Sequence, residues 1–305
     1  MSTVRRRAVT VRARPCRAVD FDFVVETEDE ALRDYLDEIC AGFPGPGPTG
    51  EVHEYTLRYT DEAPTQLELR LDGELLARFV TLTATLAHLL WDLNRRVVAA
   101  SGRFVLVHAG AVARRGPAIV LPAPMESGKT TLVTGLLRAG FSYLTDEAAA
   151  IDPSLGSVTP YAKALHLDEG SWALFPDLAP RHTERRPSFV HDQWHVPPGR
   201  VGAPVATTVP LGAVVFPRYE AGVATALTPL SAASALVELI ANCFNFALHG
   251  AQGLSAMASV IAGVRCHRLA VGDLARACQI IVELDDDIAE GADEAPTPDD
   301  REAPT

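Results

Sequence analysis

The spacing of apolar residues in the first third of the chain switches between a period of two and a period of three to four. The longer period predicts amphipathic helices over Glu28–Cys40 and Thr81–Ala100, because apolar side chains three or four residues apart share one helix face. The Gly and Pro residues of the stretch 42–50 predict an irregular loop. Alternation predicts strands over Val19–Val25, Glu54–Tyr59, Leu67–Leu71 and Glu74–Val80, the last two joined by an Asp72-Gly73 hairpin turn.

A longer apolar run follows and is interrupted once by a turn. Arg103–Ala113 and Ala118–Leu121 are predicted strands, and the Arg- and Gly-containing segment 114–117 between them is typical of a turn. The two strands would therefore form an antiparallel hairpin. A helical pattern follows Leu132 and ends near Gly140, a residue suited to the conformation that closes many helices. Two further strands are expected, at Phe141–Thr145 and Ala148–Ile151.

The next segment, residues 153–210, has little periodicity. It is rich in Pro, Gly, Arg and His, which predicts loops around short strands that face a substrate. Beyond it the regular patterns return. We expect strands at Leu211–Phe216, Val223–Leu227 and Cys266–Leu269, a helix that begins at the cap Ser231 and runs to about Ala247, and helices at Ser255–Ile261 and Val271–Leu284.

These elements divide the chain into an α+β N-terminal region, residues 1–102, and an α/β domain with a mixed sheet, residues 103–284. Residues 285–305 hold nine acidic residues and one Arg, or −8 of the net charge of −12, and this tail is predicted to be disordered. Residues 1–17 hold six Arg and no acidic residue. Such an arm is either a flexible solvated terminus or a contact for nucleic acid or an acidic peptide, and we favour the first, without a nucleic-acid partner.

Cysteine usage and hydropathy indicate a cytoplasmic protein without a membrane partner. The apolar residues after Arg5–Arg7 are interrupted by three more Arg, so no signal peptide is expected. The longest apolar region, Phe79–Ala100, contains Asp92 and two Arg, which is too many charges for a membrane span. The cysteines lack the paired spacing of metal and redox motifs and are expected to be free thiols: Cys16, Cys40, Cys243, Cys266 and Cys278.

The loop between the second hairpin strand and the helix carries the clearest chemistry. It ends in Gly128-Lys129-Thr130-Thr131, and a strand, a tight loop and a helix in this order are the setting of a phosphate-binding loop. Backbone N–H groups at a helix N-terminus attract anions. Lys129 would reach the outer phosphates, and Thr130 would offer its hydroxyl to Mg²⁺. The loop residues expected to contact the nucleotide are Ala123, Pro124, Met125, Glu126, Ser127, Gly128, Lys129, Thr130 and Thr131.

An acidic pair, Asp146-Glu147, stands at a predicted strand end after the helix. The ordered set of His108-Ala-Gly-Ala-Val, the loop and Tyr-Leu-Thr-Asp146-Glu147 resembles the HPr kinase/phosphorylase superfamily, in particular the HPr-kinase-related proteins of bacterial gene clusters. The likeness covers roughly residues 103–284. It implies a mixed-sheet, phosphate-loop kinase core of the HPr-kinase and phosphoenolpyruvate-carboxykinase type.

The resemblance also implies roles for particular residues. Asp146 would be the catalytic carboxylate that takes the proton of the acceptor hydroxyl, and Glu147 would assist with the metal. Mg²⁺ would lie between Thr130 and the acidic pair. His108 would sit beside the site, although a histidine on an apolar strand is as often a core residue. Family precedent further implies a homo-oligomer.

The loop departs from the phosphate-loop pattern in ways that bear on activity. Ala123 stands where the first Gly is usual, and Met125-Glu126 replace small residues. A carboxylate about 4 Å from a phosphate charge would be repelled by about 4 kcal/mol at an effective dielectric near 20. Either the Glu126 side chain turns away and binding is kept, which we favour, or the site is degenerate.

The function that these features predict is a kinase that uses ATP or GTP with Mg²⁺. Its acceptor would be a hydroxyl group, of Ser or Thr in a peptide or protein. The alternative is a degenerate or regulatory nucleotide-binding scaffold that docks a partner without phosphoryl transfer. A metal site at His191 and His195 is disfavoured, because the prolines that follow indicate extended chain, which separates the two rings by roughly 13 Å.

Overall fold

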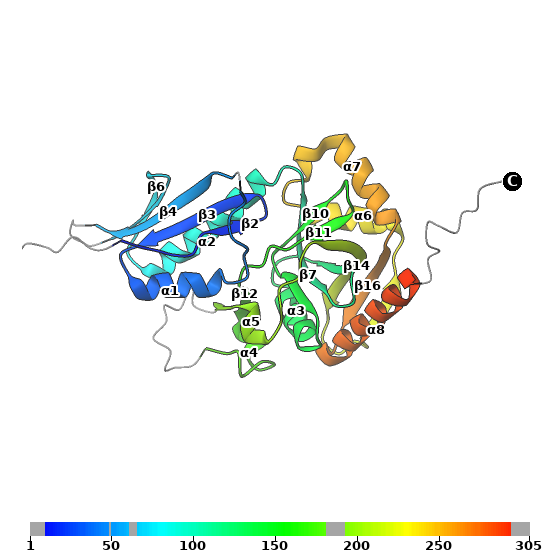
Figure 1. Ribbon diagram of the computed structural model, residues 1–305. Helices are drawn as coiled ribbons and strands as arrows, with labels where there is room; N and C mark the ends of the chain where they lie inside the picture. The colour runs from blue at the N-terminus through cyan, green and yellow to red at the C-terminus, as the bar shows by residue number, and fades with distance from the viewer. Residues whose placement is uncertain (1–9, 49, 61–65, 181–192, 294–305) are drawn as a thin grey trace, which may run out of the picture.

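The computed structural model describes residues 10–48, 50–60, 66–180 and 193–293. The chain has a mixed α/β fold with two main sheets, each covered by helices (Figure 1). The first sheet has six strands in the order β1-β3-β4-β5-β6, with β2 beside β3. Its elements are β1 (Val11–Arg12), β2 (Cys16–Ala18), β3 (Phe21–Thr27), α1 (Glu30–Ile39), β4 (Val52–Tyr59), β5 (Leu67–Leu71), β6 (Glu74–Phe79) and α2 (Leu82–Ala100).

Local sequence signals explain where these elements begin and turn. The side chains of Asp29 and Thr81 each accept a hydrogen bond from a backbone N–H three residues on, at 3.1 and 3.2 Å, and so cap α1 and α2. The hairpin of β5 and β6 turns at Asp72 and Gly73, whose φ angles of +50° and +82° suit a type I′ turn. The predicted helices and hairpin are confirmed here, with small shifts at their ends.

The predicted flexible arm is wrong for residues 11–17. Strands β1 and β2 both pair antiparallel with β3. Arg17 donates two hydrogen bonds to buried Asp22, at 2.6 and 2.8 Å, and Arg14 donates to the carbonyls of Cys40 and Phe43. Strand pairing and these specific acceptors therefore order a segment whose charge pattern alone indicated a solvated terminus. Residues 1–9 of the arm lie outside the described residues.

The second sheet carries the loop and runs β11-β10-β7-β8-β14-β16-β15, with β9 beside β7. β7 and β8 pair antiparallel, which confirms the predicted hairpin. β8, β14 and β16 are parallel, so their carboxyl ends meet at one edge of the sheet. The second sheet and its flanking elements are β7 (Val105–Ala113), β8 (Ala118–Pro122), α3 (Lys129–Arg138), β9 (Ser142–Thr145), β10 (Ala148–Asp152), β11 (Ser157–Thr159), β14 (Val209–Tyr219), β15 (Ala226–Pro229), α6 (Ala232–Ala241), α7 (Phe246–Ala262), β16 (Arg265–Val271) and α8 (Leu274–Asp293).

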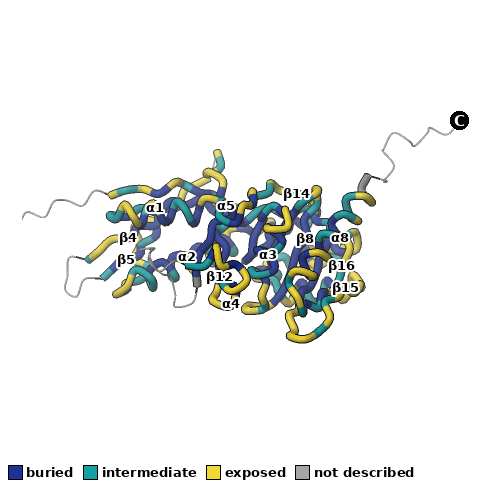
Figure 2. Tube along the Cα trace, turned by 90° about the horizontal axis from the view of Figure 1, so that it is seen from below, coloured by how far each residue is buried: buried dark blue, intermediate teal, exposed yellow. Residues whose placement is uncertain are grey.

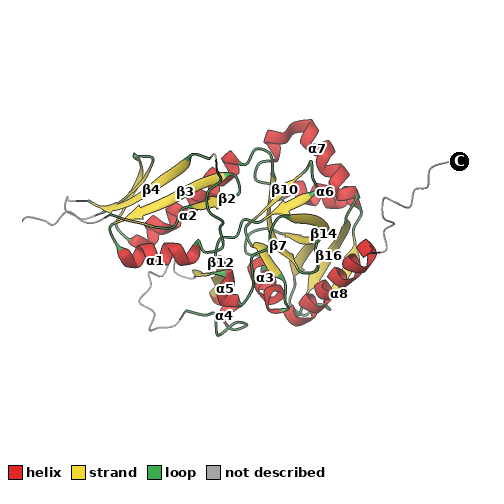
Figure 3. Ribbon diagram, viewed as in Figure 1, coloured by secondary structure: helices red, strands yellow, loops and turns green. Residues whose placement is uncertain are grey.

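Two helix pairs cover this second sheet. Side chains of α3 and α8 share a core with one face, and those of α6 and α7 share a core with the other (Figure 3). The segment expected to form loops around short strands contains a small extra sheet beside α3, made of two antiparallel strands. The elements of this segment are β12 (Leu165–Asp168), α4 (Glu169–Trp172), β13 (Gln193–Val196) and α5 (Pro198–Val201).

The helix predicted from Ser231 to about Ala247 ends earlier than expected. Ser231 caps α6 as predicted, accepting from a backbone N–H at 3.2 Å, but α6 stops at Ala241. The next residues pair with β7 instead: His108 N donates to Asn242 O at 2.7 Å, and Phe244 N donates to Leu106 O at 2.8 Å. Hydrogen bonds to a distant strand thus replace helical ones, and the helix resumes as α7.

The predicted disordered tail is wrong at its start, because α8 continues through Asp285 to Asp293. Asp285 is only 2% exposed, and Arg114 donates to its carboxylate at 3.0 Å and also pairs with Asp286. Ile281 and Leu284 on the same helix are buried against α3 and the sheet. An ion pair with the β7–β8 turn therefore keeps these acids in regular structure. Residues 294–305 lie outside the described part of the chain.

The N-terminal region shares an apolar core with the second sheet. This core joins α1 and α2 to Leu106 of β7, Ala150 of β10 and Tyr161. Figure 2 shows buried positions along the interior of the molecule and exposed positions at its edges. Tyr161 is completely buried, and its hydroxyl donates to Asn94 of α2. Among the described residues, no helix is both long and apolar enough to cross a membrane.

Candidate functional site

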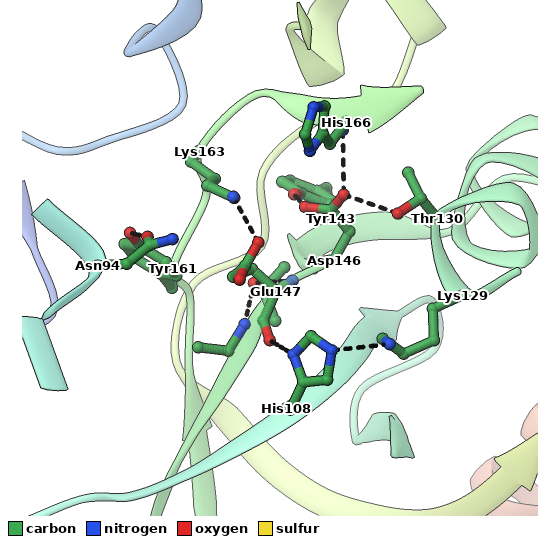
Figure 4. Close-up of polar contacts among 12 residues, drawn as sticks. Asn94, His108, Lys129, Thr130, Tyr143, Asp146, Glu147, Tyr161, Lys163 and His166 are labelled. Carbon is green, nitrogen blue, oxygen red and sulfur yellow. Dashed lines mark hydrogen bonds and ion pairs between the residues drawn. The ribbon is translucent and has the colours of Figure 1, made fainter. Parts of the chain in front are cut away.

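The loop between β8 and α3 folds around the ammonium group of Lys129. Lys129 Nζ donates to the carbonyl oxygens of Ala123 and Pro124, at 2.8 and 2.6 Å. Its third contact is His108 Nε2, at 3.0 Å (Figure 4). Gly128 starts α3 with φ of +81°, where a side chain would be strained. The result is a loop closed on its own lysine at a helix N-terminus, although Ala123 replaces the usual first Gly.

The contacts of His108 determine its tautomer. Its Nδ1 lies 3.1 Å from the backbone oxygen of Glu147, which can only accept, so Nδ1 carries the hydrogen. Nε2 is then the acceptor of the Lys129 hydrogen bond. Burial, followed by the charge of Lys129, lowers the pKa of His108, which keeps the ring neutral. His108 on β7 therefore connects the loop to the strand that carries the acidic pair.

Burial also affects Lys129, which is 6% exposed. Desolvation lowers its pKa to about 8, and the charges of Glu147 and Asp146 oppose that shift. Neutral partners occupy all three of its donors. A lysine held in this way carries a charge that the protein solvates only partly, so an anion brought next to it would be bound strongly.

Asp146 lies at the centre of the polar network. Its carboxylate accepts hydrogen bonds from the Thr130 hydroxyl at 3.1 Å, the Tyr143 hydroxyl at 2.8 Å and the backbone N–H of His166 at 3.1 Å. The side chain comes from the end of β9 and is 4% exposed. Thr130 and Asp146, which lie 16 residues apart in the sequence and were predicted to share a site, are thus in direct contact.

Glu147 points elsewhere. Its carboxylate pairs with Lys163 Nζ at 2.6 Å, and the side chains of this pair are 26% and 12% exposed. Burial raises the pKa of Glu147, but Lys163 outweighs it and holds that pKa below its usual range. In return Glu147 raises the pKa of Lys163 against the effect of burial. The structure therefore joins Thr130 to Asp146, and it directs the Glu147 carboxylate to a lysine.

Glu126 occupies a strained position in the loop. Its φ is +59°, in the left-handed region that costs a residue with a Cβ roughly 1–2 kcal/mol. The side chain is exposed and borders the cleft described next. Ser127 Oγ beside it is buried and has no hydrogen-bond partner within the described part of the chain. Strain and an unsatisfied hydroxyl in one loop are features of functional sites.

A cleft of about 980 Å³ opens beside the loop. It lies at the carboxyl ends of β14 and β16, between the start of α8 on one face of the sheet and the end of α6 on the other. Ligands of open α/β sheets bind at such strand ends. The loop residues 122–124 and 126–128 form one wall of the cleft, together with Thr131 and Leu132 of α3.

The site thus assembles four segments that are distant in sequence: β7, the loop, the β9–β10 junction and the start of β12. No family model matches this chain, and no curated protein matches it in sequence. The likeness to HPr kinases therefore rests on the ordered motifs alone. The geometry must decide which ligand the residues fit.

The described residues of the site offer oxygen ligands and hydrogen-bond donors but no self-contained metal centre. No cluster of three or more His, Cys, Asp or Glu that could hold a metal exists among the described residues. Mg²⁺ usually takes one or two carboxylates and completes its shell with phosphates and water. Thr130 and Asp146 offer that partial set of ligands. The unsatisfied Ser127 hydroxyl and the helix N-terminus offer donors to phosphate oxygens.

Sequence reasoning missed Tyr143 and the backbone N–H of His166, and it favoured a solvated surface position for Lys163, which the structure pairs with Glu147. One signal pointed to Lys163. The chain has 27 basic Lys and Arg residues but only two Lys, and these are Lys129 and Lys163. A lysine retained in a chain that otherwise uses Arg indicates a site that needs a compact point charge. Tyr143 and His166 gave no comparable signal.

The structure does not test the disfavoured histidine metal pair, because His191 lies outside the described residues. His195 on β13 is buried and stacks on His166 of β12, with ring centroids 4.8 Å apart and an interplanar angle of 6°. Its Nδ1 lies 3.4 Å from the Tyr35 hydroxyl of α1. Burial lowers the pKa of His195 well below its usual value, so the ring is neutral. It lies between α1 of the N-terminal region and β12.

The strain at Glu126 leads to a prediction. Glu126→Gly should stabilise the protein by up to about 1 kcal/mol, because Gly adopts positive φ without cost. It should also strengthen nucleotide binding about tenfold, since a negative charge leaves the cleft. Urea unfolding and calorimetric titration with Mg·ATP measure the two effects.

Met125→Gly is the matched control for Glu126→Gly. Met125 is 77% exposed and has no positive φ, so its replacement relieves neither strain nor charge. If Glu126→Gly instead lowers turnover at unchanged affinity, Glu126 belongs to the mechanism and the interpretation as a weakened loop is wrong.

Proposed function

We propose that this chain is a nucleotide-dependent kinase with a phosphate-loop core of the HPr-kinase type. It would transfer the γ-phosphoryl group of ATP or GTP to a hydroxyl group, of Ser or Thr in a peptide or protein. One observation carries the proposal: the loop closes on Lys129 at the N-terminus of α3 while Thr130 hydrogen-bonds Asp146. A phosphate-loop lysine next to a threonine–aspartate pair is the arrangement that binds Mg²⁺ and nucleotide phosphates.

Phosphoryl transfer depends mainly on positioning and charge neutralisation. Lys129 and the backbone N–H groups at the start of α3 would hold the outer phosphates. Thr130 and Asp146 would hold Mg²⁺, which neutralises phosphate charge when it is bound. Asp146 would also accept the proton of the acceptor hydroxyl, as its proposed role as catalytic carboxylate requires. Tyr143 and the His166 N–H orient Asp146 through their hydrogen bonds.

Asp146→Asn tests this assignment. The amide keeps the shape of the side chain but removes the negative charge, so nucleotide should still bind while its Mg²⁺-dependent gain in affinity and all phosphoryl transfer are lost. Calorimetric titration with ATP, with and without Mg²⁺, and phosphate release from γ-labelled ATP are the measurements.

Asp152→Asn is the control for Asp146→Asn, because Asp152 is similarly buried, at 6% against 4% exposed, but lies at the far end of β10. It should change neither quantity. If Asp146→Asn keeps full transfer, Asp146 is not the catalytic carboxylate.

The second candidate is a degenerate scaffold that docks a partner without phosphoryl transfer. Glu126 favours it, since an exposed carboxylate at the edge of the loop repels a triphosphate. A degenerate scaffold predicts no Mg·ATP or Mg·GTP binding by the wild-type chain and restored binding in Glu126→Gly, whereas a regulatory nucleotide-binding scaffold binds nucleotide but transfers its phosphoryl group to no acceptor. The kinase proposal requires binding in both proteins.

A further inference from the structure

The cleft lies on one particular side of the loop. Thr131 and Leu132 of α3 border it, whereas Lys129, Thr130 and Asp146 are not among the residues that line it. Outer phosphates held at Lys129 and Thr130 would therefore leave the rest of a nucleotide to extend past Thr131. That path leads along the carboxyl ends of β14 and β16, away from the acidic pair.

The two sides of the cleft differ in chemistry. Side chains alternate along a strand, and Val215 of β14 is buried on the α3 and α8 face, which places Tyr219 on that face as well. Val271 and Leu274 lie on the same side as Leu132 of α3. Together with Tyr219 they border the cleft. The α6 side is polar, with Arg268 paired to Glu238. The side of the cleft next to α3 and α8 is therefore apolar, and we call this surface the apolar wall.

Tyr219 is an exposed aromatic residue on that wall. It is the last residue of β14, and its side chain is 64% exposed although it is aromatic. Its hydroxyl has no hydrogen bond within the described part of the chain, so no internal contact accounts for its position. Aromatic rings at exposed positions in a cleft are suited to stack against the flat face of a base.

We propose that the cleft at the ends of β14 and β16 binds the nucleoside of the nucleotide, with the base packed on Tyr219 and on the apolar wall of Leu132, Val271 and Leu274. The inference rests on the proposed function and adds to it the residues that separate a nucleotide from a simple polyphosphate. The base would stack on Tyr219 and contact the apolar wall, while the phosphates would bind the loop. The two halves of the ligand are therefore recognised by different elements.

Tyr219→Ala separates these halves by calorimetric titration with two ligands. Mg·ATP should bind about tenfold more weakly, because one base–aromatic stack is lost. Mg·tripolyphosphate, which has no base, should bind with unchanged affinity. Tyr219→Phe should restore ATP binding, since it keeps the ring. Tyr59→Ala is the matched control: Tyr59 is 48% exposed on β4 of the other sheet and should affect neither ligand.

The outcomes distinguish this inference from the function on which it rests. If Tyr219→Ala leaves ATP affinity unchanged, or weakens both ligands equally, the base site is wrong while the loop assignment stands. Equal weakening would show that Tyr219 supports the loop rather than the base. If the wild-type chain binds neither Mg·ATP nor Mg·tripolyphosphate, the kinase proposal fails, and the base site fails with it.

Discussion

Lys129→Met should weaken Mg·ATP binding by about 30-fold to several thousandfold and leave the fold intact. Removing one member of a close, poorly hydrated charge pair costs about 2–5 kcal/mol, and the phosphates would lose their only buried cation from the loop. Stability should change little. Three hydrogen bonds are lost, but so is a charge whose pKa of about 8 shows that the fold disfavours it. Calorimetric titration and urea unfolding measure the two quantities on the same variant.

The depressed pKa of Lys129 adds a pH dependence with a defined sign. Phosphate binds the ammonium form, so Mg·ATP affinity of the wild-type chain should fall as pH rises above about 8. For folding, the unfolded chain binds the proton more tightly than the folded chain does. The cost of burying the charge is therefore present in full below about pH 8 and is relieved between about 8 and the ordinary lysine value.

Lys129→Met should abolish both of these pH effects. Arg138→Met is a suitable control, since Arg138 is an exposed cation at the other end of α3, paired with Asp177. If Lys129→Met binds nucleotide as tightly as the wild type, the phosphate loop is assigned wrongly. A wild-type affinity that is flat across pH 7–10 would contradict the role of the ammonium form.

Lys163→Met should destabilise the protein by about 3–5 kcal/mol. It leaves the Glu147 carboxylate partly buried without its cation, and breaking a buried ion pair from one side costs about that much. The pKa of Glu147 should rise, because burial raises it and Lys163 is the first of the groups that lower it. Urea unfolding at pH 7 measures the loss.

The double variant Lys163→Met with Glu147→Gln is the control for this pair. It removes both charges, so most of the lost stability should return, and the difference from the sum of the single variants measures the coupling. Lys163→Arg should also be less stable than the wild type, because a planar guanidinium differs in shape from the compact ammonium. Equal stability of Lys163→Met and wild type would show that the pair contributes nothing.

The pH window of this pair follows from the directions of the two pKa shifts. The lowered pKa of Glu147 stabilises the folded chain above the ordinary glutamate pKa, and that stability is lost as pH falls through the folded pKa. The raised pKa of Lys163 stabilises it below the ordinary lysine pKa, and that stability is lost as pH rises through the folded pKa. Between the two ordinary values the contribution is complete.

The parts of the fold that were predictable are those with local causes. The helices that Asp29, Thr81 and Ser231 cap, the Asp72-Gly73 turn and the β7–β8 hairpin all depend on residues a few positions apart. The failures have distant causes. α6 ends early because Asn242 pairs with β7, and the acidic tail starts as helix because Arg114 neutralises Asp285.

The candidate site divides in the same way. The sequence by itself determined the loop with Gly128, Lys129 and Thr130, because a strand, a tight turn and a helix start are set by neighbouring residues. It also placed Asp146 and Glu147 at a strand end. Only the tertiary structure decided their partners: Asp146 joins Thr130, whereas Glu147 joins Lys163. The two acids form the bend between β9 and β10, so the path of the chain at that bend and the residues packed around it determine which acid meets the loop.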